Sequence, residues 1–220
     1  MRDRYSIVVG LIFLAVIVVA AVNTLGGGGE GETLGLDRLP PRWPLPEFAV
    51  PEGAAELEGD ANVAQDDCET SAIPCPQDAQ RTPACRVDLE EAIRVCDLFD
   101  RPLVISFWFS KGSSRCVEQQ DLVERVYRRY RGRVGFLSLN IRDDRDTLRE
   151  LIDQREWTMP VGYDRDGAVA SLYGIGLCPT FAYVYPGGTL QSATIAELSE
   201  RQLVDRVERL LGATAAAERS

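Results

Sequence analysis

The sequence predicts an α/β domain of three layers, in which helices cover both faces of a mixed central sheet, preceded by one transmembrane helix. Three observations lead to this prediction. Strand-like and helix-like segments alternate over residues 103–173, which is typical of parallel strands joined by helices. A hairpin pattern and a last amphipathic helix follow over residues 180–211, which adds antiparallel strands. An unbroken apolar run over residues 7–22 is long enough to predict a membrane span.

Residues 1–25 form the expected membrane anchor, with the span over residues 6–25 in contact with the lipid bilayer. As a helix this span covers about 30 Å, which matches the hydrocarbon core of a bilayer. Arg2 and Arg4 precede it, so the positive-inside rule places the N-terminus in the cytoplasm and the C-terminal domain outside. A cleaved signal peptide is the alternative. In both cases the domain reaches a compartment where disulfides persist, and the anchor predicts a single-pass protein of the cell membrane.

Composition excludes several classes of function. The chain has 220 residues, of which 45% are apolar, and a net charge of −10. Such an acidic chain repels phosphate backbones, so we expect no nucleic-acid partner. The chain contains no histidine, which excludes Ser-His-Asp and Cys-His catalysis and imidazole ligands for zinc. Six cysteines leave chemistry based on sulfur open.

Changes in composition divide the chain into parts. Glycine and proline mark residues 26–45 as a linker. The domain is expected over residues 46–211. Within it, residues 52–86 are acidic, rich in cysteine and without clear apolar periodicity, so we expect an irregular insertion. Residues 212–220 are predicted to form a disordered tail.

Apolar periodicity gives the elements of the domain in order. A short amphipathic helix is expected around Ile93. The continuous apolar run over residues 103–109 is typical of a central buried strand. The elements expected after it are a helix over 122–130, a strand over 134–140, a helix over 145–156, a short strand near 161, a short helix over 168–173, strands over 180–185 and 189–195, and a helix over 199–211. We expect the strand over 189–195 to lie toward an edge of the sheet.

Five short motifs carry a resemblance through their order and spacing. They are Pro-Glu-Phe-Ala-Val-Pro at 46–51, Phe-Trp-Phe at 107–109, Asp-Arg-Asp-Gly with Leu-Tyr-Gly-Ile within 164–175, Cys-Pro-Thr-Phe at 178–181 and Tyr-Pro-Gly-Gly at 185–188. In this combination the chain resembles the redoxin branch of the thioredoxin superfamily, which includes membrane-anchored thioredoxin-like proteins and peroxiredoxins of the alkyl hydroperoxide reductase/thiol-specific antioxidant type. The resemblance implies a thioredoxin-like fold with a cis Pro179 close to the start of the helix that carries Cys116.

The region expected to hold the active site departs from the family pattern. Relatives that exchange disulfides carry Cys-x-x-Cys after the Phe-Trp strand, whereas this chain has Ser113 three residues before Cys116. The resemblance therefore implies a degenerate Ser-x-x-Cys motif. Peroxiredoxins also place a Thr or Ser three residues before their reactive cysteine, but Phe109 stands where that family needs a proline.

Cys116 is the candidate nucleophile. It follows a strand and begins a helix, whose free N–H groups and partial positive charge favour a thiolate. Lys111 and Arg115 add positive charge, so we expect a lowered pKa for the Cys116 thiol. In the fold that the resemblance implies, Cys178 and Pro179 lie beside this helix start, and the two cysteines are candidates for a redox pair. A permanent structural disulfide at Cys116 is the alternative.

The remaining cysteines are candidates for structural disulfides: Cys68, Cys75, Cys85 and Cys96. Six cysteines allow 15 pairings, and the sequence does not choose among them. The spacings of seven, ten and eleven residues match no zinc ribbon or finger, so we expect no metal and no other cofactor.

Three functions remain open at this point. The leading hypothesis is an exported, membrane-anchored thiol-disulfide oxidoreductase that acts on protein thiols or disulfides through Cys116, paired with Cys178. The second is a thiol peroxidase in which Cys116 attacks a peroxide. The third is a non-enzymatic binding or scaffold domain whose disulfides are all structural.

Overall fold

The computed structural model describes residues 35–55, 63 and 64, 84–86, 88–112, 114–217 and 219. The expected anchor over residues 1–25 lies outside these residues, and so do Cys68, Cys75 and Ser113. Within the described part of the chain, no helix combines the length and the apolar character that a membrane crossing requires.

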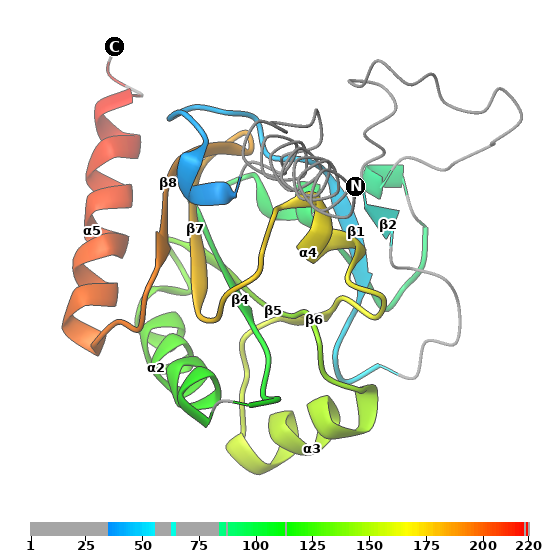
Figure 1. Ribbon diagram of the computed structural model, residues 1–220. Coiled ribbons are helices and arrows are strands. Elements are labelled where there is room, and N and C mark those ends of the chain that lie inside the picture. The colour runs from blue at the N-terminus through cyan, green and yellow to red at the C-terminus, as the bar shows by residue number, and fades with distance from the viewer. Residues whose placement is uncertain are drawn as a thin grey trace, which may run out of the picture. The chain divides into compact units, whose positions relative to one another are not determined.

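A five-stranded mixed sheet forms the centre of the domain, with the strand order β6-β5-β4-β7-β8 (Figure 1). The strands are β4 (Leu103–Trp108), β5 (Gly135–Asn140), β6 (Val161–Tyr163), β7 (Thr180–Tyr185) and β8 (Thr189–Ile195). β4 pairs in parallel with β5 and antiparallel with β7. The central place of the apolar strand and the edge place of the hairpin strand are therefore confirmed.

Helices cover both faces of this sheet, which confirms the three layers. They are α2 (Ser114–Tyr130), α3 (Arg145–Arg155), α4 (Ala168–Leu172) and α5 (Glu200–Ala217). Figure 1 shows α2 and α5 on one side of the sheet and α4 on the other. Side chains of β4 alternate between the two cores: Val104 and Trp108 pack with α2 and α5, whereas Ile105 and Phe107 pack with α4.

A second, smaller sheet was not predicted. It is antiparallel with the order β2-β1-β3, and its strands are β1 (Phe48–Pro51), β2 (Val63–Ala64) and β3 (Ala92–Arg94). The helix expected around Ile93 is therefore wrong. Ile93 pairs with Val50, and the 3-10 helix η4 (Val95–Leu98) follows. A helical pattern this short is marginal in stability, so strand pairing with β1, the middle strand of the small sheet, overrides it.

Two predicted boundaries of the domain are also wrong. Leu36, in the 3-10 helix η1 (Leu36–Arg38), and Leu45 are buried in the core, so the folded domain includes part of the expected linker. Removing these apolar side chains from water stabilises this segment in the folded domain, and this outweighs the effect of the nearby prolines and glycines, which favour an open linker. The disordered tail expected over 212–220 is helical as far as Ala217, because its alanines favour a helix.

A buried carboxylate fixes α2 to the segment that leads into β6. The Glu124 side chain accepts hydrogen bonds from the Thr158 hydroxyl at 2.7 Å, from Arg128 at 2.6 Å, and from the backbone N–H groups of Thr158 and Met159 at 3.0 and 2.9 Å. Burial alone raises the pKa of Glu124. These hydrogen bonds outweigh burial, so the pKa lies below the ordinary value of 4.5.

Replacing Glu124 with Gln is expected to lower the free energy of unfolding at pH 7 by about 2 kcal/mol, because charge-assisted hydrogen bonds are lost. A carboxylate whose pKa is lower in the folded state stabilises the fold above its unfolded pKa and loses that effect as the pH falls through its folded pKa. Urea denaturation of both proteins at neutral and acidic pH measures this. The difference between them should shrink as the pH falls below 4.5, and a difference independent of pH would contradict the assignment.

Candidate active site

A disulfide joins Cys116, in the first turn of α2, to Cys178, in the loop before β7. Their Cα atoms lie 6.0 Å apart although 62 positions separate them in the sequence. The sheet explains this proximity. Because β7 runs antiparallel to β4, Phe107 near the end of β4 pairs with Thr180 at the start of β7. The pair of cysteines that the sequence proposed is therefore brought together.

The loop that carries Cys178 is held in place by its neighbours. The peptide bond between Cys178 and Pro179 is cis, as the resemblance implied, and Pro179 is buried. The hydroxyl of Thr180 donates to the carbonyl oxygen of Leu177 at 2.8 Å. The Sγ atom of Cys178 lies 3.9 Å from the carbonyl oxygen of Phe109, so the residue that follows β4 also borders the disulfide.

A carboxylate that sequence reasoning missed supports the loop before α2. Asp143 is buried and accepts hydrogen bonds from the backbone N–H groups of Ser110 and Lys111, at 2.6 and 3.2 Å, and from the side-chain amide of Asn140 at 2.6 Å. In the same loop Gly112 has a φ of 88°, a conformation that glycine adopts without strain. The only available signal in the sequence was that Asp143 follows a buried strand closely.

The two cysteines of the pair differ in their exposure to solvent. Cys116 is only 2% exposed. Cys178 is half-buried, and Leu177, directly before it, is 63% exposed. The more exposed side of this disulfide is therefore the side of Cys178.

The two basic residues expected to tune Cys116 both form ion pairs at the surface. The Nζ atom of Lys111 lies 3.6 Å from a carboxylate oxygen of Asp144, and an Nη atom of Arg115 lies 3.5 Å from one of Glu197. All four side chains are more than half exposed, so water screens their charges strongly. The start of α2 is the remaining local feature that favours a thiolate at Cys116.

Proteins of known function resemble this chain in sequence and in structure, although no family model matches it. The thiol-disulfide oxidoreductase ResA of Oceanobacillus iheyensis is 24% identical over 123 residues, which is 56% of this chain and 62% of that protein. The chain thus matches less than two thirds of that relative's length. A DsbF homologue of Corynebacterium diphtheriae superimposes with a TM-score of 0.55 at 14% identity, over 82% of this chain and 89% of that one. Peroxidoxin BcpB of Mycobacterium tuberculosis superimposes with a TM-score of 0.54 at 14% identity, over 79% and 96%.

The structural matches share the thioredoxin-like fold, and the sequence match to ResA agrees with it. These matches support the expected resemblance to the redoxin branch of the thioredoxin superfamily. The Ser-x-x-Cys interpretation of the redoxin motif stays a prediction, because Ser113 lies outside the described residues.

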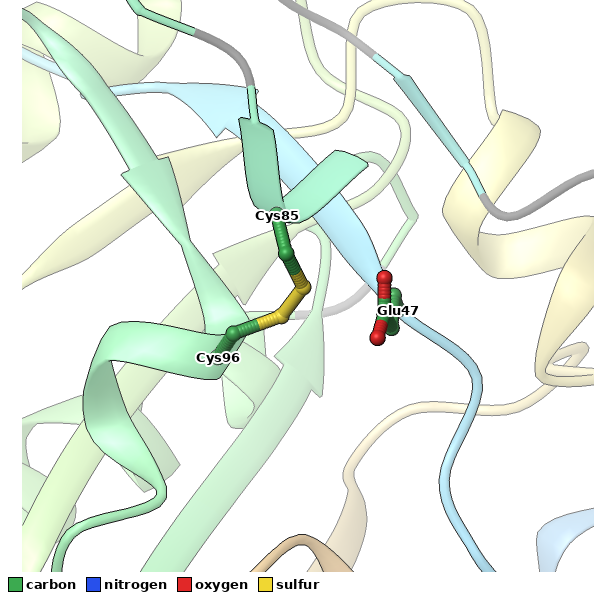
Figure 2. A group of neighbouring side chains, drawn as sticks. All are labelled: Glu47, Cys85 and Cys96. Carbon is green, nitrogen blue, oxygen red and sulfur yellow. A yellow bond between two sulfur atoms is a disulfide. The ribbon is translucent and has the colours of Figure 1, made fainter. Parts of the chain in front are cut away.

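A second disulfide joins Cys85 and Cys96, whose Cα atoms lie 5.8 Å apart (Figure 2). Cys85 belongs to the 3-10 helix η3 (Ala84–Arg86), and Cys96 belongs to η4. A carboxylate oxygen of Glu47 and the two sulfur atoms all lie within 4.8 Å of one another. Such a set holds a metal only through thiolates, and sulfur atoms bonded to each other are not thiolates. The structural role of this pair stays a prediction, and the position of the bond beside the small sheet agrees with it.

Replacing Asp143 with Ala is expected to lower the free energy of unfolding by about 3 kcal/mol, because two backbone N–H groups in the loop before α2 and the side-chain amide of Asn140 lose their acceptor. The variant Asp143→Asn is the matched control, since its side-chain oxygen can still accept and its loss should be smaller. Thermal and urea denaturation measure both effects. An Asp143→Ala variant as stable as the unchanged protein would show that this carboxylate does not hold the loop.

Proposed function

We propose that this protein is a thiol-disulfide oxidoreductase whose redox-active bond joins Cys116 and Cys178, and that protein thiols or disulfides are its substrates. The observation that carries the proposal is the position of this bond, at the junction of the β4–α2 loop and the loop before β7, where Cys178 is only half-buried. The sequence relative named as the thiol-disulfide oxidoreductase ResA supports the same activity.

The reaction needs only the two sulfur atoms of the protein and two of the partner. A partner thiolate attacks one sulfur of the disulfide, the bond between the two cysteines breaks, and the other sulfur leaves as a thiolate. A second partner thiolate then attacks the partner's own sulfur in the mixed disulfide and releases the protein as a dithiol. The partner loses two electrons and two protons and gains a disulfide, and the protein gains both. The same steps in reverse reduce a partner disulfide.

The alternatives have less support from the geometry. A thiol peroxidase needs an accessible thiolate to attack a peroxide, whereas Cys116 is buried and bonded to Cys178. The likeness to peroxidoxin BcpB, at 14% identity, concerns the fold alone. A scaffold with purely structural disulfides would not require one of its bonds to lie at a loop junction with one of its two cysteines half-buried rather than buried.

In the intact protein, we expect a mild dithiol to reduce the bond between Cys116 and Cys178 while the bond between Cys85 and Cys96 persists, because access controls the rate of exchange. Turnover of a disulfide substrate should be lost in both Cys116→Ser and Cys178→Ser. The matched control is the double variant Cys85→Ser/Cys96→Ser, which should keep turnover and lose about 2–3 kcal/mol of stability. Mass spectrometry of differentially alkylated peptides and a disulfide-reduction assay measure these effects.

Two outcomes would favour the other functions. Peroxide consumption that survives in Cys178→Ser would support the peroxidase. A bond between Cys116 and Cys178 that resists mild reductant, without any turnover, would support the scaffold.

We also propose that the domain is exported and held at the cell membrane by residues 1–25, with the N-terminus in the cytoplasm. The apolar run behind Arg2 and Arg4 supports this location, and so do two disulfides in the described part of the chain. Full-length protein is expected in the membrane fraction, and protease added outside spheroplasts should digest the domain. A soluble exported form that begins near Val22 would instead indicate a cleaved signal peptide.

A further inference from the structure

We propose that partners exchange with the redox pair through the sulfur of Cys178, and that Cys116 is the inner sulfur that resolves the mixed disulfide. This inference rests on the proposed function, in which the bond between these residues is redox active. It reverses the assignment expected from sequence, where Cys116 was the candidate nucleophile.

Access is the first argument. A thiolate attacks a disulfide sulfur from the side opposite the bond that breaks, so the attacked sulfur needs an open approach. Cys116 is 2% exposed within the first turn of α2, whereas Cys178 is half-buried in a loop whose preceding residue, Leu177, is 63% exposed. An incoming partner therefore meets Cys178 first.

The local electrostatics give the second argument, which is independent of access. The first turn of α2 has backbone N–H groups without helical partners and the positive end of the helix dipole, and both stabilise a thiolate at Cys116. The sulfur of Cys178 instead lies 3.9 Å from the carbonyl oxygen of Phe109, whose partial negative charge opposes a thiolate there. A sulfur that is stable as a thiolate is the better leaving group.

Both arguments indicate the same order of bond changes. The partner thiolate forms a bond to Sγ of Cys178, and the electron pair of the broken bond moves to Sγ of Cys116. In the reducing direction, the thiolate of Cys178 attacks the partner disulfide and expels one partner thiolate. Cys116 then attacks Sγ of Cys178 and expels the other partner thiolate. Cys116 thus never needs to contact the partner, which is consistent with its burial.

The test compares the two single variants after reduction. With 5,5′-dithiobis(2-nitrobenzoate) at about pH 9, above the ordinary thiol pKa, the rate reports mainly access. Cys178 in the Cys116→Ser variant should react at least about tenfold faster than Cys116 in the Cys178→Ser variant, since access limits a buried thiol. Peptide mass spectrometry identifies the labelled sulfur. The same pair of rates in urea is the control, and unfolding should make them equal. Equal rates in the folded variants, or a faster Cys116, would overturn the inference.

A second measurement uses the unsubstituted protein and does not depend on how the variants fold. Oxidised protein mixed with excess reduced glutathione and quenched with acid at short times should carry glutathione on Cys178, and an adduct mainly on Cys116 would overturn the inference. Different results contradict the proposed activity and the proposed order of attack. Turnover by a protein whose adducts form on Cys116 contradicts only the order of attack, whereas adducts on Cys178 without any turnover contradict the oxidoreductase.

Discussion

The antiparallel pairing of β7 with β4 is the constraint on which the rest of the site depends. Both strands are buried, and the register that places Thr180 opposite Phe107 brings the start of β7 to the end of β4. α2 begins just beyond that end of β4, and the loop with Cys178 lies just before β7. Two cysteines distant in sequence therefore meet because of main-chain hydrogen bonds in the middle of the sheet. A shift of this register by one residue would turn the buried side chains to the opposite faces. Packing of the core therefore fixes the register that brings the two cysteines together.

A buried polar network holds the helix of Cys116 against that sheet. The side-chain amide of Gln120 donates to the hydroxyl of Ser106 in β4 at 2.9 Å, and its oxygen accepts from the hydroxyl of Ser138 in β5 at 3.0 Å. The indole N–H of Trp108 donates to the same Ser138 hydroxyl at 2.8 Å. Buried polar groups without partners are costly, so rotation of α2 that broke this network would be unfavourable. The network thereby fixes which side of α2 faces the sheet, and Cys116 stays on the inner side, four residues before Gln120.

The main sheet followed from the sequence because β4 and β7 are largely apolar runs, with β4 buried along its whole length, and the Pro-Gly-Gly turn at 186–188 indicated the hairpin to β8. The small sheet did not, because β3 is three residues long and its strand character comes from pairing with β1 rather than from its own pattern.

Part of the site could not be predicted from the sequence either. The helix start gave a reason for a thiolate at Cys116 but no measure of access, and access depends on packing. The support from Asp143 depends on how one loop folds over another, which no local pattern encodes.

The bond between Cys116 and Cys178 affects the fold differently from a Cys-x-x-Cys bond. A Cys-x-x-Cys bond closes a ring of a few residues, whereas the bond of Cys178 closes a loop over a sequence separation of 62. In the chain-entropy description, a loop of that size stabilises the fold by about 4 kcal/mol. Stabilisation of a buried thiolate by a helix start is smaller, about 1 kcal/mol, and favours the reduced form. Relative to the same two cysteines in an unfolded chain, the first effect is larger, so the fold favours the oxidised pair. Reduction then removes a covalent link between the start of α2 and β7 and leaves the buried polar network and the core to hold these elements together.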